Sequence, residues 1–268
     1  MARGGTIYSR AVSVPSYAQR DQPPGVPPLA LTGERTLPDV PAENYWFRRH
    51  LAVYEWIAAR VAGERVIDMA CGEGYGSDVL AGVAASVVGV DANPEAHEHA
   101  RLRYTRPNLR FARDLVETFA EPADAVVFLQ TIEHLEDPGA TLAHFRSLVG
   151  EQGTVFVSTP NVLTLAPAGA PRSDNPWHVH EYRQQEFHDL CAAHFGRVEM
   201  YGLFHARKLR VHELALRAGW DRIHAALHLT RPFYDRFIPA IAASDFALRA
   251  APAANLDRAL DFVAVCRP

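Results

Sequence analysis

The sequence predicts an α/β protein with a Rossmann-like, mostly parallel sheet and helices on both faces. Short apolar runs alternate with helical stretches of about ten to fifteen residues, the pattern of parallel strands joined by right-handed crossovers. The first run passes directly into a glycine-rich turn, residues 71–76, that opens a helix. Asp68 and Asp91 stand at the ends of the first two runs, where open α/β sheets place their ligands.

The composition limits the kinds of partner that the protein can have. Its 268 residues carry a formal net charge of -4, which argues against nucleic acid or an anionic membrane as a partner. The three cysteines, Cys71, Cys191 and Cys266, are too far apart for a zinc or redox motif. No apolar signal core or spanning stretch is found, so we expect a cytoplasmic protein and leave homo-oligomer formation open.

The chain divides into a proline-rich N-terminal arm, residues 1–43, and a single domain, residues 44–268. Six of the 19 prolines lie in residues 1–40, and proline cannot continue helices or central strands. From Asn44 onward, aromatic residues recur at helical spacing and predict an amphipathic helix. The Ala-, Leu- and Arg-rich stretch at about 206–257 predicts a mostly helical insertion before the last strand.

The apolar runs and the stretches between them predict the order of the elements. The run 125–129 is almost wholly apolar, as strands buried on both faces are, and Pro94 suits the first turn of a helix. Strands are predicted at 65–69, 86–90, 109–112, 125–129, 154–158, 198–203 and 261–266. Helices are predicted at 75–83, 94–104, 137–149 and 184–195.

The glycine-rich turn distinguishes between two kinds of ligand. A dinucleotide site needs G-x-G-x-x-G spacing, whereas here glycines stand at 72, 74 and 76 and Ser77 follows. The carboxylate of Asp68 would repel a pyrophosphate but would pair with an ammonium group, and Asp91 can accept hydrogen bonds from both ribose hydroxyls. S-adenosylmethionine has an ammonium group, a sulfonium and a ribose but no phosphate, so the charges favour it over NAD.

Residues 64–160 resemble the class I S-adenosylmethionine-dependent methyltransferases. Five motifs of that family occur in order: V-I-D-M-A-C-G-E-G-Y-G, V-V-G-V-D, F-A-R-D-L, A-V-V-F-L-Q-T-I-E-H-L and G-T-V-F-V-S-T-P-N. The resemblance implies a seven-stranded sheet of order 3-2-1-4-5-7-6 whose antiparallel seventh strand is residues 261–266. It also implies the residues that bind the cofactor: Asp68, Gly72 and Gly74 for the methionine part, Asp91 for the ribose, Asp114 and Leu115 for the adenine, Gln130 from the fourth strand, and Ala70 and Ala92 beside them.

A narrower resemblance covers most of residues 31–205 and the terminal Arg267-Pro268. It rests on the segments L-T-G-E-R-T, E-N-Y-W-F-R-R-H, S-T-P-N, N-P-W-H and G-L-F-H. These segments are similar to actinobacterial methyltransferases linked to methylglucose lipopolysaccharide synthesis. The resemblance implies methylation of a glucose-containing oligosaccharide. The chain departs from that group at Val179-His180-Glu181, which adds a second histidine after N-P-W-H and leaves the acceptor open.

Methyl transfer to a hydroxyl needs a group that removes the proton, and a positioned histidine or carboxylate is the usual one. His134, His178 and His180 are the candidates because they follow the fourth and fifth predicted strands, on the ligand side of the sheet. His178 and His180 are two positions apart, so on an extended segment both point to one face. His97 and His99 diverge on a predicted helix and are expected at the surface. Weaker candidates for substrate binding are Tyr45, Arg49, Glu133 and Glu181, and no metal site is expected.

Three functions remain open from the sequence. The first is a methyltransferase that acts on a hydroxyl of a sugar or oligosaccharide. The second keeps the fold and the cofactor but has a quinone-like or natural-product acceptor. The third is an NAD-binding oxidoreductase or a non-catalytic nucleotide-binding module. Asp68 argues against the oxidoreductase, and the lack of a separate interaction domain argues against the binding module.

Overall fold

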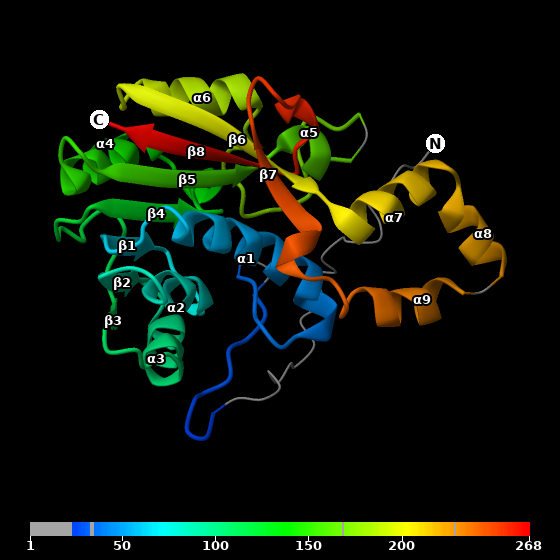
Figure 1. Cartoon of the computed structure of the whole chain (residues 1–268), viewed down its shortest axis with the longest axis horizontal. Coiled ribbons are helices and arrows are strands. Elements are labelled where there is room, and N and C mark those ends of the chain that lie inside the picture. Colours follow the sequence, from blue (N-terminus) through cyan, green and yellow to red (C-terminus); the bar gives the residue numbers. More distant parts are fainter. Residues whose placement is uncertain (1–22, 33–34, 168, 228) are drawn as a thin grey trace.

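The computed structural model describes residues 23–32, 35–167, 169–227 and 229–268, which form one eight-stranded sheet with helices on both faces (Figure 1). The strand order is β3-β2-β1-β4-β5-β8-β6-β7. The strands are β1 (Arg65–Met69), β2 (Ser86–Val90), β3 (Leu109–Ala112), β4 (Ala125–Leu129), β5 (Thr154–Pro160), β6 (Arg197–His205), β7 (Phe246–Ala250) and β8 (Asp261–Arg267). The seven predicted strands are therefore present, in the predicted order.

Strand β8 joins the two parts of the sheet. It runs antiparallel to both neighbours, pairing Val265 with Phe156 of β5 and Ala264 with Met200 of β6. The strands from β3 to β5 pair in parallel, as the buried apolar runs predict. The predicted closing strand is confirmed, since residues 261–266 all lie in β8.

An eighth strand corrects the prediction of a mostly helical insertion. Residues Phe246–Ala250 form β7, which pairs antiparallel with β6 at Leu203 and Leu248. The strand β6 runs to His205, beyond the predicted end at 203, and so offers an edge to which β7 can pair. The insertion therefore contains an edge strand, and its α-helices all lie before that strand.

The helices cover both faces of the sheet. Alternate strand residues face two separate cores: Val66 packs with α1 and α2, whereas Ile67 packs with α4 and α6. The helices are α1 (Asn44–Ala58), α2 (Tyr75–Ala81), α3 (Pro94–Arg103), α4 (Pro138–Val149), α5 (Val162–Leu165), α6 (Gln184–Ala192), α7 (Arg207–Arg217), α8 (Trp220–Ala226) and α9 (Thr230–Phe237). Short 3₁₀ turns occur at Pro41–Glu43, Ile132–His134, Ala243–Asp245 and Leu256–Arg258.

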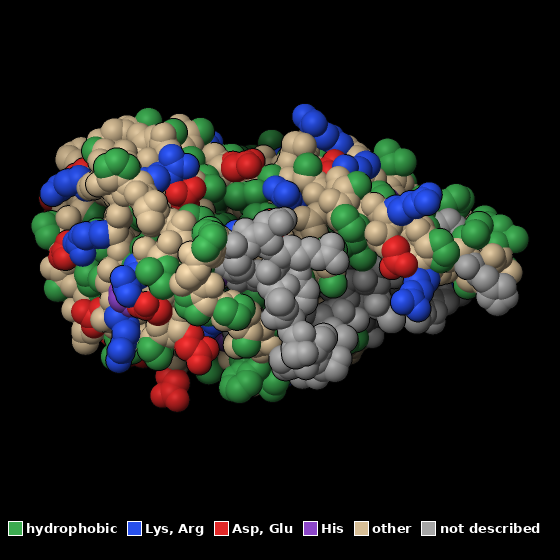
Figure 2. Space-filling model, turned by 90° about the horizontal axis from the view of Figure 1, so that it is seen from below, with side chains coloured by type: hydrophobic (Ala, Val, Ile, Leu, Met, Phe, Trp, Pro, Cys, Tyr) green, Lys and Arg blue, Asp and Glu red, His purple; other side chains and the backbone are tan. Residues whose placement is uncertain are grey.

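Helices α7, α8 and α9 extend away from the sheet between β6 and β7 (Figure 1). Figure 2 shows Lys and Arg side chains beside hydrophobic ones on this extension. Several of its apolar side chains are exposed, among them Val211, Ile223 and Leu227. Within the part of the chain that the structure describes, no helix has the length and apolar composition needed to cross a membrane.

The described part of the N-terminal arm packs against the body, and this corrects the prediction for His99. Its imidazole is fully buried, with Nδ1 2.6 Å from the carbonyl oxygen of Pro27 and Nε2 3.0 Å from Glu73 Oε1. The arm covers this side of α3, so a helix position that looked solvent-facing in the sequence is enclosed. Residues 1–22 of the predicted arm lie outside the described residues.

Candidate active site

The loop after β1 has an unusual backbone. Ala70, Gly72 and Gly74 all have positive φ angles, of 56°, 58° and 96°. The left-handed region is costly for a residue with a Cβ, so Ala70 marks a position where the surrounding structure imposes the conformation. Such outliers gather at functional sites. The loop lies at the carboxyl end of β1, where open α/β sheets bind ligands.

The glycines of this loop are needed for different reasons. A Cβ built on Gly74 would lie 2.8 Å from the Cβ of Ala100 on α3, and one on Gly76 would lie 2.1 Å from the ring of Tyr54. Nothing lies within 4 Å of a Cβ built on Gly72. Gly74 and Gly76 therefore permit close packing inside the protein. Gly72 faces open space, and it is the glycine at which a ligand can approach the backbone.

Asp68 lies beneath this loop and is fully buried. Its Oδ1 accepts a hydrogen bond of 3.1 Å from the Tyr54 hydroxyl, and its Oδ2 accepts one of 2.7 Å from the Ser77 hydroxyl. Burial raises the pKa of Asp68 to about 7, although both hydrogen bonds lower it. The carboxyl is therefore close to half ionised at neutral pH. Its contact with the cofactor ammonium group stays a prediction.

Asp91 connects the ends of β1 and β2. Its Oδ2 accepts a hydrogen bond of 2.8 Å from the Gly72 N–H, and its Oδ1 accepts one of 2.9 Å from the Asn93 N–H. The side chain is half-buried, and the next residue, Ala92, is exposed. The carboxylate thus holds Gly72 in place while remaining accessible to a ligand.

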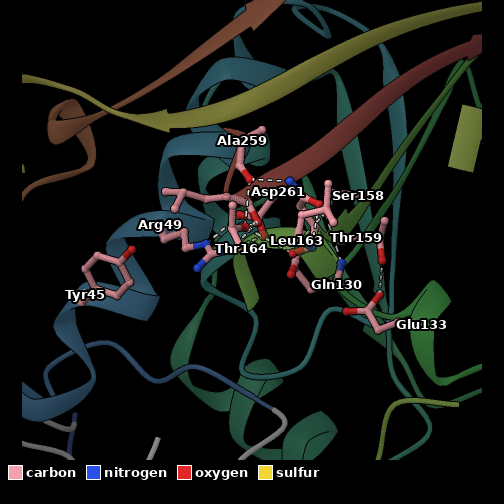
Figure 3. Close-up of polar contacts among 12 residues, drawn as sticks. Tyr45, Arg49, Gln130, Glu133, Ser158, Thr159, Leu163, Thr164, Ala259 and Asp261 are labelled. Carbon is pink, nitrogen blue, oxygen red and sulfur yellow. Dashed lines mark hydrogen bonds and ion pairs between the residues drawn. The ribbon is translucent and has the colours of Figure 1, made fainter. Parts of the chain in front are cut away.

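The other predicted cofactor residues lie at the ends of β3 and β4. Asp114 accepts hydrogen bonds from the Leu115 N–H at 2.8 Å and from the Thr118 hydroxyl at 2.7 Å. Both hydrogen bonds lower the pKa of Asp114, and the one from Thr118 has the larger effect. Leu115 is exposed. Gln130 has a positive φ of 52°, and its Nε2 donates to Ser158 Oγ at 3.0 Å (Figure 3). The structure thus brings all nine predicted residues to the carboxyl edge of β1 to β4.

Beyond Gln130, a cluster of three side chains lies at the same edge. Glu133 and His134 belong to the 3₁₀ turn after β4, and His178 comes from the segment between α5 and α6. One ligand atom from each of the three lies within 4.8 Å of the others, although the sequence predicted no metal site. Glu133 is buried, and its Oε2 accepts a hydrogen bond of 3.2 Å from the Thr159 hydroxyl (Figure 3).

The hydrogen bonds of the two histidines define which ring nitrogen carries the proton. His134 Nδ1 lies 3.0 Å from the Trp177 carbonyl oxygen, which can only accept, so this nitrogen carries the hydrogen. His178 Nδ1 lies 2.8 Å from Glu181 Oε1. Burial alone would raise the pKa of Glu181, but hydrogen bonds from Ser173 and His178 lower it, so the carboxylate also accepts. In the neutral rings, the hydrogen then lies on Nδ1 of both histidines, and Nε2 is the nitrogen that carries the lone pair.

His180 does not share the face of His178, and that prediction is wrong. Its imidazole is exposed, and its Nε2 lies 2.6 Å from Glu186 Oε1 in the first turn of α6. The segment bends at Val179, and the N–H groups of Val179 and His180 both donate to the Glu133 carbonyl oxygen, at 2.9 and 3.1 Å. The bend turns His178 inward and His180 outward.

Two weaker candidates, Tyr45 and Arg49, are held by contacts within the protein. Arg49 forms a buried ion pair with Asp261, with Nε 2.7 Å from Oδ2 and Nη2 2.5 Å from Oδ1 (Figure 3). Tyr45 is buried, and its hydroxyl lies 2.9 Å from His205 Nε2. Sequence reasoning missed Asp261, and it missed Thr159 as a partner of Glu133. The only local signal for Thr159 is its place in the S-T-P-N segment.

The parallel sheet, the glycine loop after β1 and the strand-end carboxylates define a Rossmann-like methyltransferase fold. Residues 43–214 match the family model described as a methyltransferase domain. The chain belongs to this family, and it is an S-adenosylmethionine-dependent methyltransferase.

Comparisons with individual proteins agree with this family assignment. A probable S-adenosylmethionine-dependent methyltransferase of Mycobacterium tuberculosis is 37% identical over 267 residues, 94% of this chain and 96% of the relative. A ubiquinone biosynthesis O-methyltransferase of Albidiferax ferrireducens is 33% identical over 178 residues, 61% of this chain and 70% of the relative. A solved methyltransferase of Thermotoga maritima has a TM-score of 0.56 at 14% identity, over 83% of this chain and 92% of that one, which shows the fold alone.

Proposed function

We propose that this methyltransferase transfers the methyl group to a hydroxyl oxygen of a sugar or oligosaccharide. The observation that carries the proposal is the pair of imidazoles, His134 and His178, whose Nδ1 atoms are held by the Trp177 carbonyl and the Glu181 carboxylate at the end of β4, beside the predicted cofactor residues. One imidazole takes the hydroxyl proton as the oxygen attacks the methyl carbon. The carbon–sulfur bond breaks, its electron pair stays on sulfur, and S-adenosylhomocysteine is released.

The surroundings of the cluster suit a carbohydrate. Trp177, whose carbonyl oxygen orients His134, is 61% exposed. A large exposed aromatic ring beside polar groups offers a surface for the apolar face of a sugar ring. Glu133 and Glu181 stay weaker candidates for substrate binding, because both side chains are buried and accept hydrogen bonds from Thr159, Ser173 and His178. The resemblance of the N-P-W-H and G-L-F-H segments to methyltransferases linked to methylglucose lipopolysaccharide synthesis would imply the same class of acceptor.

A second acceptor is supported by a different observation. The ubiquinone biosynthesis O-methyltransferase of A. ferrireducens matches 61% of this chain at 33% identity. A quinone-like phenol would present a flat ring to Trp177 and a hydroxyl to the histidines. A phenol loses its proton more easily than a sugar hydroxyl, so it would depend less on the base.

The test compares His134→Ala, His178→Ala and His180→Ala with the wild type. Each is assayed for methyl transfer to a glucose oligosaccharide and to a catechol, and separately for S-adenosylhomocysteine binding by calorimetry. Removal of the base should lower turnover by about 10²–10⁴-fold and leave cofactor affinity nearly unchanged. We rank His134 and His178 above His180. Full turnover in all three variants would exclude an imidazole base, and transfer to the catechol alone would replace the sugar with a phenol.

A further inference from the structure

The cluster at the acceptor side has the composition of a metal site. Glu133, His134 and His178 each offer one ligand atom, and these atoms lie within 4.8 Å of one another. Two imidazole nitrogens and one carboxylate oxygen form a donor set typical of divalent transition metals, whereas Mg²⁺ and Ca²⁺ prefer oxygen alone. We propose that these three residues bind a divalent transition-metal ion such as Zn²⁺ or Mn²⁺.

The surrounding hydrogen bonds already orient the three ligands. A metal-binding histidine usually donates its other ring N–H to a carbonyl or a carboxylate. His134 does so to the Trp177 carbonyl at 3.0 Å and His178 to Glu181 at 2.8 Å, so both rings are already held in a fixed orientation. Glu133 accepts from Thr159 at 3.2 Å, so its carboxylate is also held.

Backbone contacts fix the two loops to each other. The N–H groups of Val179 and His180 both donate to the carbonyl oxygen of Glu133. The segment that carries His178 is thereby tied to the turn that carries Glu133 and His134. The ligands come from two segments far apart in the sequence, yet their relative position does not depend on a long side chain.

Burial and exposure around the cluster suit a reactive ion. The side chains of Glu133 and His178 are 1% and 7% exposed, whereas His134 is only half-buried. Three protein ligands leave at least one coordination position for water or substrate, as in catalytic zinc sites. The less buried His134 marks the side from which that position can be reached.

The chemical role of the ion rests on the proposed O-methyl transfer. A hydroxyl that coordinates a divalent cation has a lower pKa and releases its proton to solvent water. The oxygen then forms the bond to the methyl carbon while the carbon–sulfur bond breaks with its electron pair on sulfur. The cluster would then activate the hydroxyl by coordination, and neither imidazole would need to take the proton.

Metal binding is measured on the full chain after chelator treatment, by calorimetric titration with ZnCl₂ and with MnCl₂. Co²⁺ absorption in the visible range reports the coordination as a second readout. We expect one ion for each wild-type chain and binding at least about 100-fold weaker in Glu133→Gln and His178→Ala. His134→Ala is a third variant, in case a buried substitution prevents folding. Glu181→Gln, which only orients His178, should weaken binding about 10–100-fold.

His188→Ala is the matched control, because His188 is a partly exposed histidine on α6, outside the cluster. It should bind the ion as the wild type does. Absence of ion binding in the wild type, or equal binding in the cluster variants and the control, would overturn the metal site. The acceptor assay separates the two proposals: a chain that binds the ion but transfers no methyl group to the glucose oligosaccharide keeps the metal site and loses the proposed function.

Discussion

The candidate active site has a predicted cofactor half and a proposed acceptor half, and the two are built in different ways. The cofactor half, formed by the ends of β1 to β4 up to Gln130, is shaped by backbone: positive φ angles at Ala70, Gly72 and Gly74, and N–H groups held by Asp91. The acceptor half, Glu133, His134, His178 and Glu181, is formed by side chains on a turn and an irregular segment. A backbone-built site keeps its shape through most substitutions, whereas a side-chain site can change its acceptor one residue at a time.

The largest expected effect concerns the buried ion pair that joins α1 to β8, outside both halves. Arg49→Met leaves Asp261 buried without its partner and should lower the free energy of unfolding by about 3–5 kcal/mol. Chemical denaturation measures this loss, and Arg48→Met on the same helix is the control. Adding Asp261→Leu to Arg49→Met should restore most of the loss, because the charge is then removed as well. A loss below about 1 kcal/mol in Arg49→Met would show that the ion pair is not needed.

The next effect compares two glycines of the cofactor half: Gly74, which permits close packing, and Gly72, at which a ligand can approach the backbone. Gly74→Ala combines a left-handed backbone with a Cβ 2.8 Å from Ala100, so we expect a loss of roughly 2–4 kcal/mol in stability. Gly72→Ala has the same kind of backbone strain but open space, so the fold should lose only about 1–2 kcal/mol. In exchange, Gly72→Ala should bind S-adenosylhomocysteine more weakly. Equal cofactor affinity in Gly72→Ala and the wild type would show that the ligand does not approach the backbone at this glycine.

The smallest effect concerns the charge of Asp68. Its pKa of about 7 means that the carboxyl is increasingly protonated below pH 7, whereas the cofactor ammonium favours the ionised form. The dissociation constant of S-adenosylhomocysteine should therefore rise as the pH falls below 7, by up to about tenfold for each pH unit. Calorimetry from pH 5.5 to 8.5 measures it, with Asp68→Asn expected to lack this slope. A wild-type dissociation constant that does not change with pH would show that the charge of Asp68 does not contribute to cofactor binding.

The raised pKa of Asp68 changes the stability of the fold with pH in the opposite direction to the cofactor affinity. The unfolded chain releases the Asp68 proton near the ordinary carboxyl pKa, whereas the folded chain keeps it up to about pH 7. The contribution of Asp68 to stability is therefore complete at low pH and declines as the pH rises toward 7. Cofactor affinity and stability should thus change in opposite directions over this range.

The sequence predicted the positions of the residues that follow β1 and β2 better than those of the acceptor half, for a physical reason. Strand runs, glycine turns and strand-end carboxylates are local patterns, so Asp68, Gly72 and Asp91 could be placed without any distant contact. The pairing of Arg49 with Asp261 joins positions 212 residues apart, and no local pattern signals it. The opposite directions of His178 and His180 depend on a bend fixed by Glu133, a residue that periodicity cannot connect to them.

The position of β8 has a consequence for how the protein is made. Because synthesis proceeds from the N-terminus, β5 and the β6–β7 pair leave the ribosome before the strand that joins them exists. Until Asp261–Arg267 has emerged, β5 and β6 each present an edge with unpaired N–H and C=O groups to the cell. Asp261 also completes the ion pair with Arg49, near the start of the domain. The nascent chain therefore carries its greatest risk of aggregation late, and a chaperone that shields strand edges would help it most at that stage.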